Sequence, residues 1–261
     1  RKVKNPTRGD YKNYVVEGEQ ITSDYHKAYT SARRAYKNVN NLMRCNIDEF
    51  EYFVTLTFAE KKNKEKYKRK SERENFDLFW DYVNGYDIDQ AFEAYRKFMK
   101  KMRTWSRREE IDLKYITVWE KHKSGKIHFH IVLNEIPVLK LYNLPDWLSM
   151  DFKTYEKDNQ QGLKYWKYGK SEVQRIRDKR KMSTYISKYL VKGFKNIDVG
   201  EYNKYLDKKK YFASRKLAKP KESYINDDKL DKYFDETISP DVETEYSDYV
   251  NKKITRKLIN T

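Results

Sequence analysis

The sequence is poor in cysteine, in histidine and in long apolar segments. Its 261 residues include one cysteine, Cys45, and four histidines. A single cysteine excludes an internal disulfide and is typical of a protein in a reducing cytosol. No apolar run approaches the roughly 20 residues that a helix needs to cross a membrane, and no secretory signal peptide is evident. We therefore expect a cytoplasmic protein without a membrane partner.

The composition is rich in basic and aromatic residues instead. Charged residues make up 37% of the chain and the mean hydropathy is −1.09, yet 16% of the residues are aromatic, which argues against disorder. The net charge is +17. Residues 221–261 hold seven basic and ten acidic residues, which leaves +20 on residues 1–220. A folded body with this charge favours a polyanionic partner, and nucleic acid is the leading candidate.

Residues 126–133 form a strand-like run with two histidines one residue apart. Side chains alternate between the two faces of a strand, so His128 and His130 point to one face while four apolar residues point to the other: Ile127, Phe129, Ile131 and Leu133. Two imidazoles side by side can bind one metal ion. The alternative is that both histidines only form hydrogen bonds within the sheet.

A second strand precedes this one and adds a carboxylate. Residues 115–120 are predicted to form a strand, and residues 122–126 a hairpin loop. A five-residue loop places Lys121 opposite Ile127 and Glu120 opposite His128. The predicted donor set of Glu120, His128 and His130 suits a divalent cation that keeps open positions for substrate oxygens.

The other elements are predicted from their patterns. A helix is expected from about residue 22 to 42, a strand at 52–58, a helix that opens at Asp87 or Asp89, and a strand at 172–176. Thr55 and Thr57 share one face of the strand at 52–58 and are candidates to line the histidine face, or they are ordinary strand threonines. The stripe on the helix after residue 89 is a core face, made by Phe92, Tyr95, Met99, Met102 and Trp105.

A tandem Tyr-x-x-Lys pattern follows at residues 183–193. With Ser183 as the predicted start of a helix and Gly193 as its end, one face carries Tyr185, Lys188, Tyr189 and Lys192. A phenol with a pKa near 10 is a weak nucleophile at neutral pH, and a nearby ammonium favours the phenolate. The chain has 24 tyrosines, so composition alone is the alternative explanation.

These patterns together predict attack of a tyrosine on a phosphodiester, aided by a metal ion. Such a transesterification needs no ATP. Residues 168–171 resemble part of a phosphate-binding loop, but Lys164 stands where that motif requires glycine. We therefore expect no nucleotide cofactor.

Three motifs resemble the HUH endonucleases, specifically the rolling-circle replication initiators (Rep proteins) of single-stranded DNA phages and plasmids. They occur in the order of that group: Phe53-Val54-Thr55-Leu56-Thr57-Phe58, then His128-Phe129-His130, then Tyr185-Ile186-Ser187-Lys188-Tyr189. Glu120 stands at the position of the third metal ligand. Residues 166–169 and 211–217 also look similar, so the resemblance runs from about residue 45 to 220.

The resemblance implies an α+β fold, with about five antiparallel strands, helices on one face and the active site on the other. It implies Mg²⁺ or Mn²⁺ as cofactor and a 5′-phosphotyrosine link to single-stranded origin DNA, with or without a hairpin. A host helicase and a DNA polymerase are the implied partners in a bacterial cell. Tyr185 matches the nucleophile and Tyr189 a second tyrosine, while Lys188 and Lys192 would hold the phosphate or stabilise the phenolate.

We expect three parts of the chain: a basic arm and helix at 1–48, the endonuclease domain at 49–220 with an insertion around 135–165, and an acidic, aromatic extension at 221–261. Arg215 is a candidate DNA contact or simple surface charge. Three alternatives stay open: a non-catalytic DNA-binding protein on the same scaffold, a transposase of the same chemistry, and a metal hydrolase that uses water.

Overall fold

The protein is described by a computed structural model that covers residues 15–16, 19–20, 23–60, 81–143, 161–195, 204–205, 207–220, 242–247 and 253–258. The chain divides into two compact units, residues 1–217 and residues 218–261. The second unit contains an antiparallel pair, β10 (Val242–Ser247) and β11 (Lys253–Leu258). A short pair near the start of the first unit is formed by β1 (Val15–Val16) and β2 (Glu19–Gln20).

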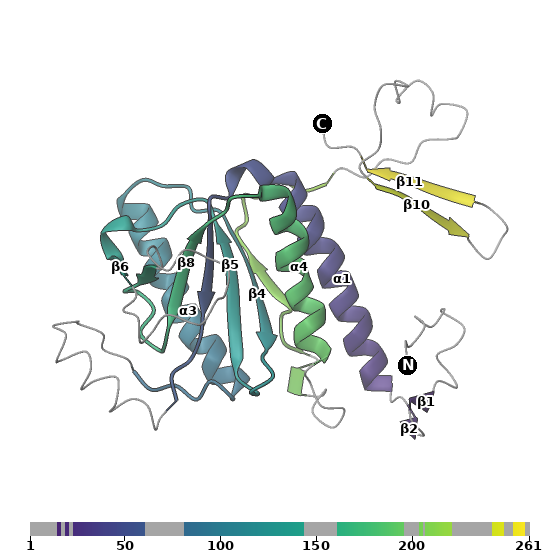
Figure 1. The fold of residues 1–261 in the computed structure, drawn as a ribbon, viewed down its shortest axis with the longest axis horizontal. Helices are drawn as coiled ribbons and strands as arrows, with labels where there is room; N and C mark the ends of the chain where they lie inside the picture. The colour runs from purple at the N-terminus through teal and green to yellow at the C-terminus, as the bar shows by residue number, and fades with distance from the viewer. Residues whose placement is uncertain are drawn as a thin grey trace. The chain divides into compact units, whose positions relative to one another are not determined.

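An antiparallel sheet of seven strands forms the centre of the first unit (Figure 1). Its spatial order is β6-β7-β8-β3-β5-β4-β9. In chain order the strands are β3 (Tyr52–Leu56), β4 (Tyr115–Lys121), β5 (Ile127–Leu133), β6 (Leu141–Asn143), β7 (Gln161–Leu163), β8 (Ser171–Arg175) and β9 (Tyr211–Ala213). The predicted α+β class with a central antiparallel sheet is confirmed.

Helices cover both faces of this sheet, which corrects the expectation of helices on one face only. The helix α3 (Ile88–Arg108) packs on one face, against the alternate residues of β5 that include Phe129 and Ile131. The helices α1 (Ser23–Cys45) and α4 (Lys179–Lys195) cover the other face, where Phe53, Ile116 and Val132 form a second core. Figure 1 shows α3 on one side of the strands and the α1–α4 pair on the other. The sheet is therefore the middle layer of three.

The sequence patterns explain why the helices begin where they do. The Asp87 side chain caps α3 by accepting hydrogen bonds from the backbone of Asp89 and Gln90, as predicted. The α3 stripe packs into the core, with Trp105 only half-buried at its end. The helix α4 begins four residues before the predicted Ser183, because Asp178 Oδ1 accepts from the Lys181 backbone at 2.9 Å. It also continues past Gly193 to Lys195.

The predicted insertion around 135–165 contributes to the edge of the sheet. It contains a short 3-10 helix, η3 (Val138–Lys140), and then β6 and β7, which pair with each other. Gln161 of β7 also pairs with Val173 of β8. Residues 144–160 lie outside the described part of the chain. The strand count rises from the expected five to seven because of this pair.

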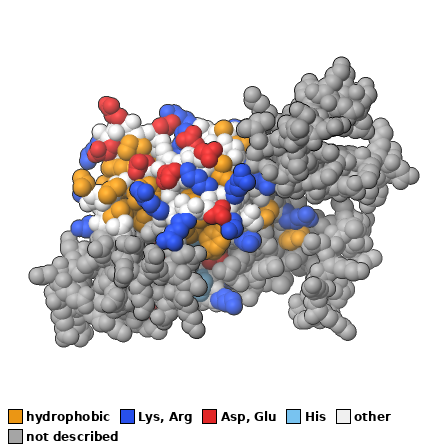
Figure 2. All heavy atoms as spheres, turned by 45° about the horizontal axis from the view of Figure 1, so that its top comes forward, with side chains coloured by type: hydrophobic (Ala, Val, Ile, Leu, Met, Phe, Trp, Pro, Cys, Tyr) orange, Lys and Arg blue, Asp and Glu red, His pale blue; other side chains and the backbone are white. Residues whose placement is uncertain are grey.

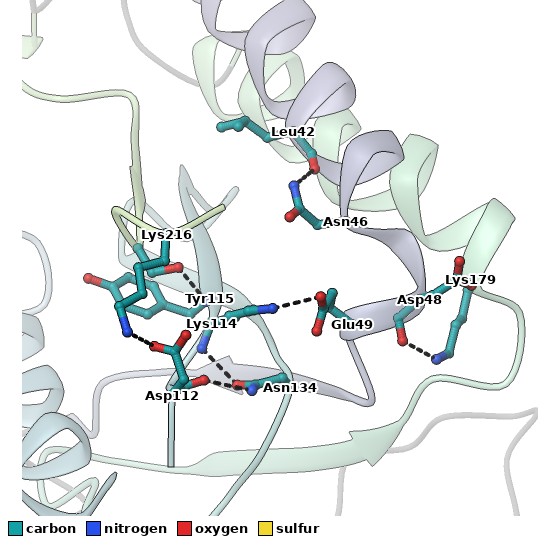
Figure 3. A network of polar contacts seen from close by, with 11 residues as sticks. Leu42, Asn46, Asp48, Glu49, Asp112, Lys114, Tyr115, Asn134, Lys179 and Lys216 are labelled. Carbon is teal, nitrogen blue, oxygen red and sulfur yellow. Dashed lines mark hydrogen bonds and ion pairs between the residues drawn. The ribbon is translucent and has the colours of Figure 1, made fainter. Parts of the chain in front are cut away.

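A polar network ties the connections at one end of the sheet together (Figure 3). Lys114, just before β4, forms an ion pair of 2.6 Å with Glu49 of the 3-10 helix η2 (Ile47–Glu49), and its backbone donates to Asn134. Lys179 at the start of α4 donates to the carbonyl oxygen of Asp48 at 2.9 Å. These contacts fix the start of α4 relative to the sheet.

No helix in the part of the chain that the structure describes is long and apolar enough to cross a membrane.

Candidate active site

Polar side chains gather on the face of the sheet that α4 covers. Glu120 of β4 pairs directly with His128 of β5, as the loop length predicted, and Thr55 of β3 pairs with His130. Thr55 also pairs with Glu172 of β8. Because residues paired across an antiparallel sheet share one face, these side chains form a polar row across four strands.

His130 and Glu120 form the buried part of this row. The two side chains are only 3% and 2% exposed, and His130 Nε2 lies 3.4 Å from Glu120 Oε1. On the other side of the ring, Thr55 Oγ1 lies 3.3 Å from His130 Nδ1. The imidazole is thus held between a hydroxyl and a carboxylate, an arrangement that fixes which nitrogen faces the carboxylate.

His128 lies at the more open part of the row. Its ring stacks on His122, with the ring centres 4.8 Å apart. Burial, helped by the neighbouring imidazoles of His130 and His122, lowers the pKa of His128 to about 3. The ring is therefore neutral at physiological pH, which is the form that binds metal ions.

The three predicted metal ligands are thus on one face, although their side chains do not converge on one point. Within the described ranges, no group of three His, Cys, Asp or Glu side chains is close enough to hold a metal ion. His128 turns toward His122, and His130 is covered by an aromatic ring of α4. By residue type and strand register, Glu120, His128 and His130 fit Mg²⁺ or Mn²⁺.

Both predicted tyrosines of α4 lie over this row. The Tyr189 ring stacks on His130 with ring centres 3.6 Å apart, and its hydroxyl donates to the Tyr185 hydroxyl at 2.5 Å. Tyr185 also contacts the edge of Phe53. Tyr185 is 46% exposed and Tyr189 is half-buried. Burial, the hydrogen bond to Tyr185 and the charges of Glu120 and Glu172 all raise the pKa of Tyr189, so its proton is held firmly.

The other predicted site residues lie at different places. Lys188 is exposed on α4, beside the tyrosines in sequence, and the side chain of Lys192 lies outside the described residues. Thr57 Oγ1 donates to the carbonyl oxygen of Lys170 at 3.1 Å rather than to a histidine. Arg215 is exposed in the turn after β9, near the Tyr115 end of β4, whereas Glu120 is at the other end of that strand.

Sequence reasoning missed two charged members of the row. Glu172 is 6% exposed and Lys170 is 8% exposed, and their side chains form an ion pair of 3.8 Å. The strand at 172–176 was predicted, but its Glu-x-Gln alternation resembles an ordinary solvent-facing strand. Only the pairing of β8 with β3 brings these residues to the site, and that pairing joins segments more than 100 residues apart.

The surface view shows how charge is spread on the part of the molecule that it displays (Figure 2). On the described part of this face, Lys and Arg side chains stand among acidic and apolar ones, without a continuous basic band. The basic charge is therefore not gathered on this face.

The model of one protein family matches this chain. It is described as replication-associated protein, of the ORF2 and gene 2 protein type, and it matches residues 51–194, which is more than half of the sequence. The match runs from β3 to α4 and so includes both histidines and both tyrosines of the site. No curated protein and no solved structure gives a significant match. The match to residues 51–194 shows that the chain belongs to this family of replication-associated proteins.

Proposed function

We propose that this protein is an HUH endonuclease that starts rolling-circle replication by nicking and rejoining single-stranded DNA at an origin. Family membership supports a role as a replication initiator that acts on origin DNA. The finer proposal is that Tyr185 is the nucleophile and that a 5′-phosphotyrosine link is the intermediate.

One observation carries this proposal: an exposed tyrosine hydroxyl stands beside a buried histidine–carboxylate pair. Tyr185 is 46% exposed, and its oxygen accepts a hydrogen bond from Tyr189, whose ring covers His130. A hydrogen bond donated to an oxygen favours the ionised form of that oxygen. The accessible hydroxyl is thus the one that is prepared to become the stronger nucleophile.

The reaction is a transesterification that balances without a cofactor that is consumed. The Tyr185 oxygen forms a bond to phosphorus and gives up its proton, while the bond between phosphorus and the 3′ oxygen breaks and that oxygen takes up a proton. The products are a 5′-phosphotyrosine and a free 3′-hydroxyl, which a polymerase can extend. Rejoining is the same exchange in reverse, so the bond energy is retained in the protein–DNA link.

Glu120, His128 and His130 would hold a Mg²⁺ or Mn²⁺ ion. When bound, such an ion supplies Lewis acidity to a phosphate oxygen. The chain's own contribution is orientation. Thr55 contacts one nitrogen of His130 and leaves the other directed to Glu120, and partners of this kind usually fix a ligand ring in place.

Roles for the remaining side chains of α4 follow from their exposure. Lys188 is exposed beside the tyrosines, so we assign it, with Lys192, to a DNA phosphate. Tyr189 is either a second nucleophile in a later cleavage or the hydrogen-bond donor that prepares Tyr185. Host helicase and DNA polymerase in the bacterial cytoplasm are the partners that this reaction would require.

The test is a denaturing gel of the protein mixed with fluorescent single-stranded oligonucleotides tiled across the replicon that encodes it, with Mn²⁺. Wild-type protein is expected to give a protein–DNA adduct that the Tyr185→Phe variant does not form. Persistence of the adduct in Tyr189→Phe would restrict Tyr189 to a supporting role. Cleavage without an adduct would assign the nucleophile to water. Binding without cleavage, in any metal and across all oligonucleotides, would support the non-catalytic DNA-binding protein.

A further inference from the structure

The lysine and glutamate of the polar row are not used by the proposed reaction. Lys170 comes two residues before Glu172, so the alternation of the strand gives both side chains the same face of the sheet. Their ion pair of 3.8 Å agrees with that placement. Glu172 pairs with Thr55, the residue that contacts His130. The pair is thus one strand away from the candidate metal ligands.

The backbone of Lys170 is fixed firmly to the end of β3. Its carbonyl oxygen accepts hydrogen bonds from both the backbone and the hydroxyl of Thr57, at 2.8 and 3.1 Å. At Gly169 a β-carbon would come within 2.3 Å of the Thr57 oxygen and 2.6 Å of the Ala59 nitrogen. Glycine at position 169 is therefore needed for this close approach, and the approach sets where the Lys170 side chain begins.

The ammonium of Lys170 lacks the contacts that a buried cation normally has. Its Nζ is buried and makes no hydrogen bond within the part of the chain that the structure describes. The Glu172 oxygen at 3.8 Å is too distant for a hydrogen bond, and Glu172 Oε1 instead accepts from Gln174 at 2.6 Å. An ammonium has three donors, and leaving them unsatisfied in a buried site is costly. A cost of this kind at a site is typical of a group that is held for a ligand.

We propose that Lys170 binds a non-bridging phosphate oxygen of the DNA strand that enters the active site, and that Glu172 holds the ammonium in place until that phosphate arrives. The ligand is an anionic oxygen because the free group is a cation with donors only. The flexible four-carbon stem of lysine allows the ammonium to turn from Glu172 to the phosphate. This inference rests on the proposed function, since it assumes that DNA is the ligand of this face.

Competition between Glu172 and the phosphate makes the two side chains respond in opposite directions. Loss of the cation removes a phosphate contact, so Lys170→Met is expected to weaken binding of single-stranded DNA about tenfold. Loss of the competing negative charge frees the cation, so Glu172→Gln is expected to strengthen binding several-fold. A general loss of folding cannot produce these opposite effects.

The experiment measures fluorescence anisotropy of a labelled single-stranded oligonucleotide with the full chain in EDTA, across a series of salt concentrations. For a single strand, each phosphate contact contributes about 0.7 to the slope of log K against log salt, so Lys170→Met should lower that slope by about 0.7. Lys114→Met is the matched control, because it removes one partly buried lysine at the other end of β4. It should leave the slope unchanged.

A second measurement locates the phosphate. Oligonucleotides with one neutral methylphosphonate at successive positions should show one position that weakens wild-type binding about tenfold and has no effect on Lys170→Met. Equal weakening by Lys170→Met and Glu172→Gln, or an unchanged salt slope, would overturn the proposal and restrict the pair to a structural role. The proposed function is judged separately, since the adduct gel with Tyr185→Phe gives its result whatever Lys170 binds.

Discussion

The two faces of β5 differ although their residues alternate along one strand. Phe129 is fully buried between the rings of Phe92 and Tyr95 on the α3 side. Its neighbour His130 is almost as buried, but it contacts a hydroxyl, a carboxylate and the Tyr189 ring on the α4 side. Burial alone therefore does not separate a structural residue from a candidate catalytic one. The chemical nature of the contacts does.

The difference shows how the molecule divides its tasks. The α3 face is filled by apolar and aromatic side chains, which contribute stability through burial. The α4 face keeps polar groups under a helix, at some cost in desolvation. We expect substitutions on the first face to lower stability, and substitutions on the second to remove activity at little cost in stability.

The largest expected effect is on the α4 face. His130→Gln should lower adduct formation at least about 1,000-fold, because it removes a metal-binding nitrogen, while the free energy of unfolding changes by about 1 kcal/mol or less. Adduct gels and urea denaturation of the same preparation measure both quantities. If the adduct persists at the wild-type level, His130 is structural and the contrast between the faces fails.

The matched substitution on the other face is Phe129→Ala. Because it leaves a cavity among three aromatic rings, it should lower the free energy of unfolding by about 3–5 kcal/mol. Urea denaturation checks this value, with Leu139→Ala as the control, since Leu139 is 94% exposed and should lose less than about 0.5 kcal/mol. A loss below about 1 kcal/mol for Phe129→Ala would contradict the packing described here.

A smaller effect is expected at a polar contact within the α3 layer that joins helix to sheet. The buried Tyr95 hydroxyl donates to Thr117 Oγ1 at 2.8 Å. Tyr95→Phe leaves the Thr117 hydroxyl without this donor and should lower the free energy of unfolding by about 1–2 kcal/mol. Thermal unfolding provides the measurement. Tyr82→Phe, at a side chain that is 44% exposed, should give no comparable change.

The smallest effect concerns a cation beside the α3 layer. Burial lowers the pKa of Lys210 to about 8, and its ammonium lies over the Trp119 ring. Between about pH 8 and its unfolded pKa near 10.4 the unfolded chain binds more protons, so wild-type stability gains from this group as pH rises. Lys210→Met should therefore stabilise the protein by about 1 kcal/mol at about pH 7, and this advantage should shrink at about pH 10.

Urea denaturation at both pH values tests the Lys210 prediction. A stabilisation that is the same at about pH 7 and about pH 10 would show that packing of the methionine, rather than loss of the charge, is responsible.

Local patterns were sufficient where one short segment determines the geometry. The loop at 122–126 fixes the register of its own hairpin, and Glu120 was therefore placed opposite His128 correctly. The stripe and the Asp87 cap of α3 likewise depend on residues of the helix itself. These features follow from residues that are close in sequence.

Features that depend on distant segments were not predictable in this way. Val132 lies on the histidine face, and nothing near it in the sequence shows that α1 and α4 cover it. The start of α4 was placed too late because residues 179–181 are all basic and hide the cap at Asp178. Glu172 and Lys170 reach the site only through the pairing of β8 with β3.

The β6–β7 pair has a consequence for how this protein tolerates changes in length. Asn143 and Gln161 are directly paired, so the chain leaves the sheet and returns to it at neighbouring positions. Two strands that end opposite each other can be joined by a turn of about two residues. Residues 144–160 therefore form a natural exchange point, where a deletion, a tag or a reporter domain would leave the register of the catalytic strands unchanged.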